Sequence, residues 1–302
     1  MLQKHLLSTV AYYDCLEYPL TAFEAWQHLL VLDLYAPSGA VSLGTVWRNL
    51  TELVMLQKLE CINGMYVLLG RSHLVSQRIQ EEKISVLKLK RVRRLIRWLA
   101  WIPFIRMIGI AGSLSMKKSD VLSDWDFFVI LRAGRLWIGR TLLTGVLHLF
   151  GKRRYGSKIQ DRACLNYYLS DGHLAVHPQD IYAANEYRFL LPILDRGMAR
   201  SFGLANRWIA RYKPQYRIPE ISSLWTLPEK TIWKWLESVF DWDWLEIWLA
   251  SWQKKKVLLN PKTKLEGSFI QVNGEALIFL PEPKGPIVFD RFKTRLGSIG
   301  LP

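Results

Sequence analysis

The spacing of apolar and polar residues predicts helices at the start of the chain. Residues 2–16 have a helical pattern, and Thr21 with Glu24 forms a capping box that begins a second helix. Ser42 is placed to cap a third helix. Two short apolar runs then flank Asn63–Gly64, a pair that favours a tight hairpin turn. We therefore expect three helices followed by a β-hairpin.

The rest of the chain is predicted to contain a small sheet between two helical regions. A basic connecting helix covers residues 71–102, and Pro103 ends its pattern. Aromatic and β-branched runs predict the strands of a mixed sheet within residues 103–177. Residues 178–302 are predicted to be mostly helical, apart from a hairpin at Asn273–Gly274. The expected fold class is α+β.

The order of elements in residues 1–70 resembles a winged helix-turn-helix domain. This segment holds three Lys and Arg residues against six Asp and Glu residues. The helix in the position of a recognition helix contains Arg48 and Glu52, and so has no net positive charge. DNA binding draws much of its affinity from neutralised phosphates. We therefore expect this winged-helix-like domain to serve in packing or protein contacts, with DNA binding as the less favoured alternative.

Positive charge is concentrated in the middle of the chain. The 302 residues carry a formal net charge of +15, and ten basic residues but no acid lie between Lys83 and Ser119. Seven further basic residues and no acid lie between Phe127 and Gln160. The basic stretch 83–118 suits a nucleic-acid or lipid surface, but it also suits the solvated face of a connecting helix.

The remaining composition argues against several classes of protein. Half of the residues (50%) are hydrophobic, which is enough for two or three domains with real cores. The three cysteines, Cys15, Cys61 and Cys164, fit neither a zinc spacing nor a disulfide framework. Neither a signal peptide nor an uninterrupted apolar stretch of about 20 residues is evident. We expect a cytoplasmic protein without a transmembrane segment.

Asp124 and Asp126 are the clearest candidates for chemistry. They flank Trp125 at the start of the run FFVIL, which predicts a buried strand. Side chains two apart on a strand point to the same face, so both carboxylates should lie together at the end of the strand. Burying ionised carboxylates is costly unless something compensates them. A hard divalent cation is the usual partner of such a pair.

The same tripeptide occurs again at Asp241 to Asp243, in a different pattern. The apolar residues around it recur at helical spacing, namely Trp235, Val239, Trp242, Leu245 and Leu249. Residues two apart on a helix lie about 200° apart around its axis. We therefore expect these two aspartates to lie on a solvated helical face and to be unable to share a metal ion.

The segment from Gly112 to Asp126 resembles the signature of the polymerase-beta-type nucleotidyltransferase superfamily. Gly112–Ser113 is followed by ten residues, by Asp124-x-Asp126 and by an apolar strand. The resemblance lies within residues 103–177 and implies a strand, a Gly-Ser turn, a short helix and a strand with paired carboxylates. It also implies transfer of a nucleoside monophosphate from a nucleoside triphosphate, ATP being the first candidate. The acceptor cannot be identified from the sequence.

The resemblance implies a role for each residue of the signature. Asp124 and Asp126 would hold two Mg²⁺ ions, or Mn²⁺, which act on the reacting phosphate. A glycine lets the backbone approach phosphates closely, and a serine at a helix start can hold them. Lysines in the following loop could reach phosphate oxygens, although loop lysines are more often simply solvated. The expected nucleotide-binding residues are thus Gly112, Ser113, Lys117 and Lys118.

The third carboxylate that the superfamily implies is not evident. The natural strand for it, residues 163–169, offers Asn166 as the candidate third position. Asp161 and Asp171 bracket that strand without lying inside it. An amide oxygen is a poorer Mg²⁺ ligand than a carboxylate, which puts catalysis, but not the fold, in question. The alternative to an enzyme is a catalytically degenerate regulator or adaptor with this fold, with nucleic acid as a candidate ligand.

Overall fold

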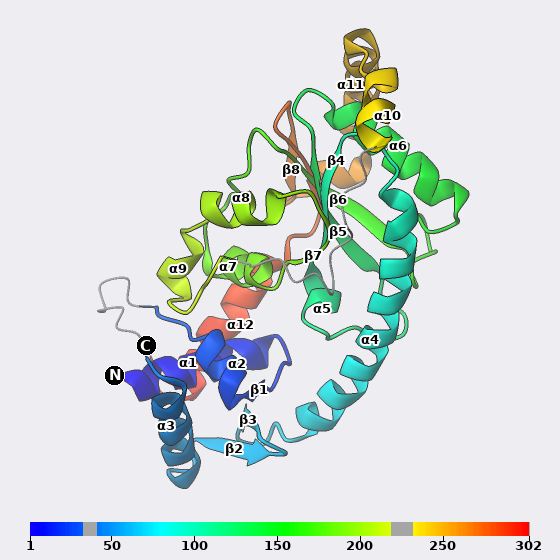
Figure 1. Cartoon of the computed structure of the whole chain (residues 1–302). Helices are drawn as coiled ribbons and strands as arrows, with labels where there is room; N and C mark the ends of the chain where they lie inside the picture. The colour runs from blue at the N-terminus through cyan, green and yellow to red at the C-terminus, as the bar shows by residue number, and fades with distance from the viewer. Residues whose placement is uncertain (33–40, 219–231, 302) are drawn as a thin grey trace.

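The N-terminal helices and a six-stranded sheet occupy separate parts of the molecule (Figure 1). The computed structural model describes residues 1–32, 41–218 and 232–301. Its helices and strands form the expected α+β structure. Helix α4, His73–Leu99, runs from the N-terminal helices to the sheet. Residues 219–231, in the region predicted to be mostly helical, lie outside the described residues.

The N-terminal elements begin where the capping residues predict. Thr21 and Glu24 form the expected capping box, and the Ser42 side chain caps the third helix. The hairpin turns at Asn63–Gly64, and both residues have a positive φ. The elements are α1 Leu2–Cys15, β1 Leu20–Thr21, α2 Ala22–Gln27, α3 Leu43–Met55, β2 Leu59–Ile62 and β3 Met65–Leu68. The three strands form a sheet in the order β1-β3-β2.

The C-terminal helix α12, Lys284–Ser298, packs onto these N-terminal elements. The rings of Phe292 and Tyr12 meet edge to face with their centroids 5.2 Å apart. Arg295 forms an ion pair with the buried Asp14 at 2.8 Å. The end of the chain therefore completes the hydrophobic core of its beginning.

Helix α4 buries the apolar stripe that its sequence predicts. Val92, Leu95, Ile96 and Leu99 lie in the core beneath the sheet. Its charged residues are not all solvated, because Lys88 is only 2% exposed. Among the described residues, no helix is both long and apolar enough to cross a membrane.

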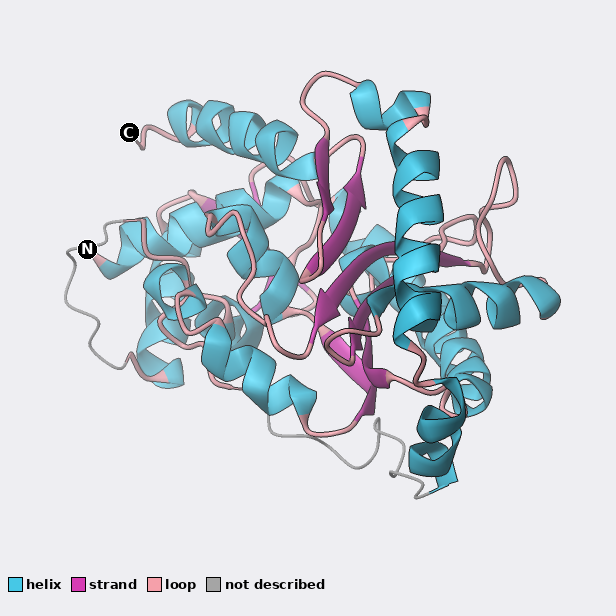
Figure 2. Ribbon diagram, turned by 90° about the horizontal axis from the view of Figure 1, so that it is seen from above, coloured by secondary structure: helices cyan, strands magenta, loops and turns pink. Residues whose placement is uncertain are grey.

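The larger sheet is mixed and lies between two layers of helices (Figure 2). Its strands are β4 Ile105–Ile110, β5 Trp125–Leu131, β6 Ala163–Ser170, β7 Leu191–Asp195, β8 Phe269–Val272 and β9 Ala276–Leu280, in the order β7-β4-β5-β6-β9-β8. Strands β5 and β6 are parallel, and the other neighbours are antiparallel. One face packs on α4 and α6 (Leu136–Leu149), and the other on α7 (Ile181–Arg188), α8 (Met198–Ala205) and α9 (Ile209–Tyr212). The sheet thus draws three strands from beyond the expected segment 103–177.

Two predicted helical stretches are interrupted. Residues Leu191–Asp195 form an edge strand, because Pro192 cannot extend a helix and is tolerated at the edge of a sheet. The Trp-rich stretch forms two helices, α10 Ile232–Phe240 and α11 Asp243–Leu258, and a 3₁₀ turn at Pro261–Lys264 follows. The prediction of one continuous helix through the second Asp-Trp-Asp was therefore wrong.

Candidate metal and nucleotide site

The two aspartates of the first Asp-Trp-Asp meet at the start of β5. One carboxylate oxygen of Asp124, one of Asp126 and the Sγ atom of Cys164 lie within 4.8 Å of one another. Trp125 is buried on the face that packs on α4 and α6. Because strand side chains alternate, both carboxylates turn toward the opposite face, where α7 lies. The pair can therefore contact one common ligand.

Helix α4 fixes the main chain immediately before the first aspartate. Lys88 Nζ donates to the carbonyl oxygens of Ser123 at 2.7 Å and Val121 at 3.1 Å. Ser85 Oγ accepts a hydrogen bond from the Ser119 N–H at 2.9 Å. These buried contacts hold the loop that carries Asp124 into the site. They also explain why one lysine of the basic helix is not solvated.

Gly112 lies directly against the carboxylate of Asp126. Its φ is +64°, and a Cβ atom at this position would come 2.5 Å from Asp126 Oδ2. A side chain here would therefore be strained and would collide with the carboxylate. Gly112–Ser115 form the short helix α5, and Ser113 Oγ lies 3.4 Å from Ser119 Oγ. The Gly-Ser turn and the aspartate pair thus belong to one site.

Helix α7 brings a further carboxylate that we did not predict. Glu186 Oε1 accepts the Gly112 N–H at 2.7 Å, so this backbone donor of the Gly-Ser turn has a protein partner. Tyr182, one turn earlier on α7, also hydrogen-bonds Glu186. No local signal distinguishes Glu186 from an ordinary helical glutamate, because only the fold brings it to the turn.

Negative charge accumulates around Asp126. Burial, together with the carboxylates of Asp124 and Glu186, raises the pKa of Asp126 to about 7. Burial also raises the pKa of Glu186, although the hydrogen bond from Gly112 acts against that. In the described parts of the chain, no group donates a hydrogen bond to the Asp126 carboxylate. A bound cation would relieve both the burial and the repulsion.

Two basic residues offset part of this charge. Arg154 Nη1 lies 2.5 Å from Asp124 Oδ2 and 3.6 Å from the Sγ of Cys164. Lys284, the first residue of α12, acts to lower the pKa of both Asp126 and Glu186 through its positive charge. Cations beside a carboxylate pair suit a site for a metal-bound anion such as a triphosphate.

Cys164 occupies the position beside Asp126 on β6, the strand on which a third carboxylate was sought at Asn166. The parallel register of β5 and β6 pairs Asp126 with Cys164, and Asn166 lies further along, where the register shifts. Burial and the two aspartates raise the pKa of Cys164 to about 12. The thiol is therefore protonated and neutral at physiological pH. A ligand role for Asn166 stays a prediction.

The other charged candidates are paired with residues outside this cluster. The pairs are Asp161 with Lys88 and Arg91, Asp171 with Arg106, Lys117 with Glu82 at 3.1 Å, and Lys118 with Glu17 at 3.2 Å. Among the described acids, neither Asp161 nor Asp171 shares the ligand cluster of the aspartate pair. A triphosphate would have to draw Lys117 or Lys118 away from its glutamate.

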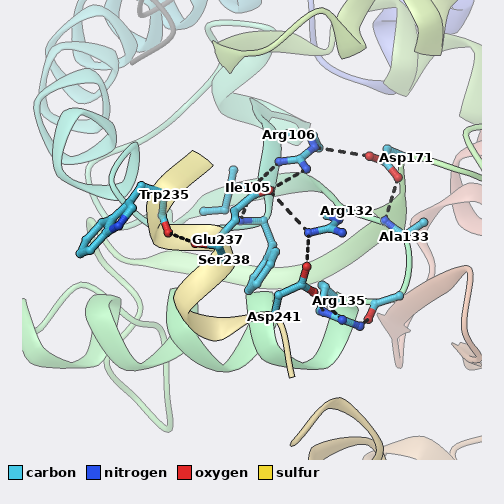
Figure 3. Close-up of polar contacts among 12 residues, drawn as sticks. Ile105, Arg106, Arg132, Ala133, Arg135, Asp171, Trp235, Glu237, Ser238 and Asp241 are labelled. Carbon is cyan, nitrogen blue, oxygen red and sulfur yellow. Dashed lines mark hydrogen bonds and ion pairs between the residues drawn. The ribbon is translucent and has the colours of Figure 1, made fainter. Parts of the chain in front are cut away.

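The second Asp-Trp-Asp is neutralised by arginines (Figure 3). Arg135 Nε donates to Asp241 Oδ1 at 2.5 Å, and its Nη2 lies 2.7 Å from Asp243 Oδ1. Arg132 Nη1 lies 3.0 Å from Asp241 Oδ2. The prediction of a solvated helical face holds for Asp243, which begins α11 and has an 85% exposed side chain. It was wrong for Asp241, which follows the end of α10 at Phe240 and pairs with Arg132 and Arg135.

Asp124 and Asp126 fit a hard divalent cation, whereas the third member of their cluster does not. Carboxylate oxygens are preferred ligands of Mg²⁺ and Mn²⁺. Sulfur is a soft ligand and a poor one for these hard ions, so Cys164 does not complete the set. Asp124 and Asp126, assisted by water, are the residues that would hold the metal.

Comparisons with known proteins supply no relative from which a function could be transferred. No protein-family model matches the chain, and no curated protein or solved structure matches it significantly. A function for this chain therefore has to be inferred from the geometry and chemistry of the site.

Proposed function

We propose that this protein is a metal-dependent nucleotidyltransferase of the polymerase-beta type. It would transfer a nucleoside monophosphate from a nucleoside triphosphate, ATP being the first candidate, to an acceptor of unknown class. The contact between Gly112 and Asp126 carries the proposal. A turn with positive φ, between a strand and a short helix, lies against paired carboxylates of the neighbouring strand. This is the arrangement that the superfamily signature implies.

The residues of the site would divide the work of nucleotidyl transfer. Bound Mg²⁺ or Mn²⁺ would neutralise charge on the reacting phosphate and activate the attacking group of the acceptor. Asp124 and Asp126 would hold the metal in their ionised forms, and Ser113 would hold the triphosphate. Lys284 would balance phosphate charge. Glu186 would have to release the Gly112 N–H before that donor could bind a phosphate oxygen.

Pyrophosphate release tests the proposal directly. The full chain is incubated with each labelled nucleoside triphosphate in Mg²⁺ or Mn²⁺. We expect release that requires metal, that is lost in Asp126→Asn and that is retained in the matched variant Asp241→Asn. Release that persists unchanged in Asp126→Asn would overturn the assignment of the site.

A catalytically degenerate regulator or adaptor with the same fold is the second candidate. Cys164 beside Asp126 favours it, since the neighbouring position on β6 carries a thiol and no carboxylate. Glu186 on the Gly112 N–H favours it too, because it occupies a backbone donor of the Gly-Ser turn. Nucleotide binding without pyrophosphate release would identify this function.

Nucleic acid is a candidate ligand under either function. Lys90, Arg94 and Arg97 of the basic stretch 83–118 are exposed on α4. Binding through them should weaken steeply with salt, because phosphate contacts release counterions. For the winged-helix-like domain, residues 1–70, we propose a packing role, which the contact of Phe292 with Tyr12 supports. Nucleic-acid binding that is insensitive to salt and is lost on removing residues 1–70 would contradict both the role of the basic stretch and the packing role of residues 1–70.

A further inference from the structure

Helix α11 exposes an apolar face made mainly of tryptophan. Trp244, Trp248 and Trp252 recur every four residues, and Ile247 lies beside Trp248. Trp244, Ile247, Trp248 and Trp252 are 64%, 67%, 59% and 53% exposed. These four residues are here called the tryptophan face. Figure 1 shows α10 and α11 at the end of the molecule opposite the N-terminal helices, and Figure 3 shows Trp235 of α10 pointing away from the ion pairs beside it. Contiguous exposed apolar faces mark interaction surfaces.

The opposite side of α11 is fixed to the protein. Glu246 accepts the N–H groups of Trp137 and Ile138 at the start of α6, each at 2.9 Å. Gln253 Nε2 donates to Thr141 Oγ1 at 2.8 Å. The helix therefore cannot simply rotate to bury its tryptophans, and the exposure of the tryptophan face follows from how α11 is anchored.

We propose that the tryptophan face docks on an anionic membrane surface, with α11 lying in the headgroup region. Indole combines a large apolar ring with a polar N–H, and tryptophan is enriched at membrane–water interfaces for that reason. Three exposed lysines, 254 to 256, end the helix beside the face and complement anionic headgroups. The acids of α11, Asp243 and Glu246, are bound by Arg135 and by α6.

The arrangement of the rings favours lipid over nucleic acid. Trp242 stacks on Trp244 and Trp248 stacks on Trp252, with interplanar angles of 15° and 6°. The Lys256 ammonium lies 5.5 Å from the centre of the Trp252 ring. Bases bind by stacking on open ring faces, and these contacts cover part of that surface. The membrane proposal goes beyond nucleotidyl transfer and does not depend on it.

Flotation of the full chain with lipid vesicles tests the proposal. We expect binding to vesicles containing phosphatidylglycerol, little binding to pure phosphatidylcholine, and weakening by salt. Replacing Trp244, Trp248 and Trp252 together by Ser should weaken binding roughly 100-fold. Replacing lysines 254–256 by Gln should remove the preference for phosphatidylglycerol. Trp47→Ser removes a tryptophan that is 57% exposed on α3, and should bind like the wild type.

A measurement on the wild type complements flotation. Quenching of the wild-type tryptophan fluorescence by brominated phosphatidylglycerol requires no substitution, and it should be clear if the rings insert. Absence of vesicle binding, or equal binding by the triple Trp variant and the wild type, would overturn the proposal. The proposal would also be overturned if the wild type does not bind vesicles but self-associates or binds single-stranded DNA, and the triple Trp variant loses that interaction. Either result would assign the face to that partner.

Discussion

The two Asp-Trp-Asp tripeptides of this chain have opposite electrostatic environments. At the first, burial and two neighbouring carboxylates raise the pKa of Asp126 to about 7. At the second, burial acts in the same direction on Asp241, but hydrogen bonds and charges from Arg132 and Arg135 outweigh it and lower the pKa. The tripeptide alone therefore defines no site. Its neighbours decide whether a carboxylate pair is left for a cation.

Neutralising one aspartate in each Asp-Trp-Asp tripeptide should produce the largest contrast, which is in turnover. We expect Asp124→Asn or Asp126→Asn to reduce turnover by roughly a thousandfold or more, because each removes a metal ligand that acts on the transition state. Asp241→Asn should leave turnover within about twofold, since it lies outside the site. Initial rates of pyrophosphate release with saturating metal measure both. Similar losses at the two pairs would mean that the effect comes from folding rather than chemistry.

Gly112 offers a test of how closely the turn and the first pair are joined. Gly112→Ala should lower the free energy of unfolding by about 2–4 kcal/mol, because positive φ strains Ala and its Cβ would meet Asp126. Gly134→Ala is the matched control: its φ is +72°, but no atom lies within 4 Å of the added Cβ. Urea denaturation of both variants separates strain from collision. Equal losses would show that Asp126 can move aside at no cost.

The two pairs should also respond to pH with opposite signs when no metal is bound. Asp126 has a folded-state pKa of about 7 against 3.8 for the free side chain. Between these values the folded state holds a proton that the unfolded state has lost, so stability falls as pH rises from about 4 to about 7. For Asp241 the folded pKa is lowered. The stabilisation that Asp241 contributes to the folded state is therefore present above its unfolded-state pKa. It is lost as the pH falls through its folded-state pKa.

Urea denaturation between pH 3 and pH 8 measures this contrast. Relative to the wild type, Asp126→Asn should gain about 1–3 kcal/mol of stability as the pH rises through this range. The deficit of Asp241→Asn should instead shrink toward acid pH. A difference for Asp126→Asn that stays constant over the whole range would refute the raised pKa.

Local signals were read correctly from the sequence, whereas long-range partners were not. The capping box at Thr21 and the turn at Asn63–Gly64 depend on residues a few positions apart, so the sequence reports them. Glu186 and Lys284 reach Asp126 only because α7 and the C-terminal helix pack beside the sheet. No spacing rule connects them to the signature.

The broken Trp-rich helix shows the same limit in secondary structure. Its apolar period continues across Asp241 and Trp242, and periodicity alone therefore predicts one helix. The break instead coincides with ion pairs from Arg132 and Arg135, on the segment that follows β5. Tertiary charge pairing, which a single-sequence pattern does not contain, distinguishes the two tripeptides.

The smallest expected effect is the change in Mg²⁺ affinity when a third carboxylate is added beside Asp124 and Asp126. Cys164 pairs with Asp126 across the β5–β6 register and carries no charge at neutral pH. Cys164→Asp would add a hard oxygen ligand within the existing cluster. We expect it to tighten Mg²⁺ binding about tenfold, the added attraction being partly offset by repulsion among three carboxylates. Asn166→Asp tests the position that was predicted from sequence.

Calorimetric titration of Mg²⁺ into the wild type and the two variants distinguishes these positions. If the register decides, Cys164→Asp tightens binding and Asn166→Asp changes it little. If Asn166→Asp alone tightens binding, the shift in register turns residue 166 into the site and the original prediction holds. Cys164→Ser is the matched control, because it keeps the size of the side chain and adds no charge. If the Ser variant binds as tightly as the Asp variant, the thiol limits metal binding by its softness, and a missing charge is not the cause.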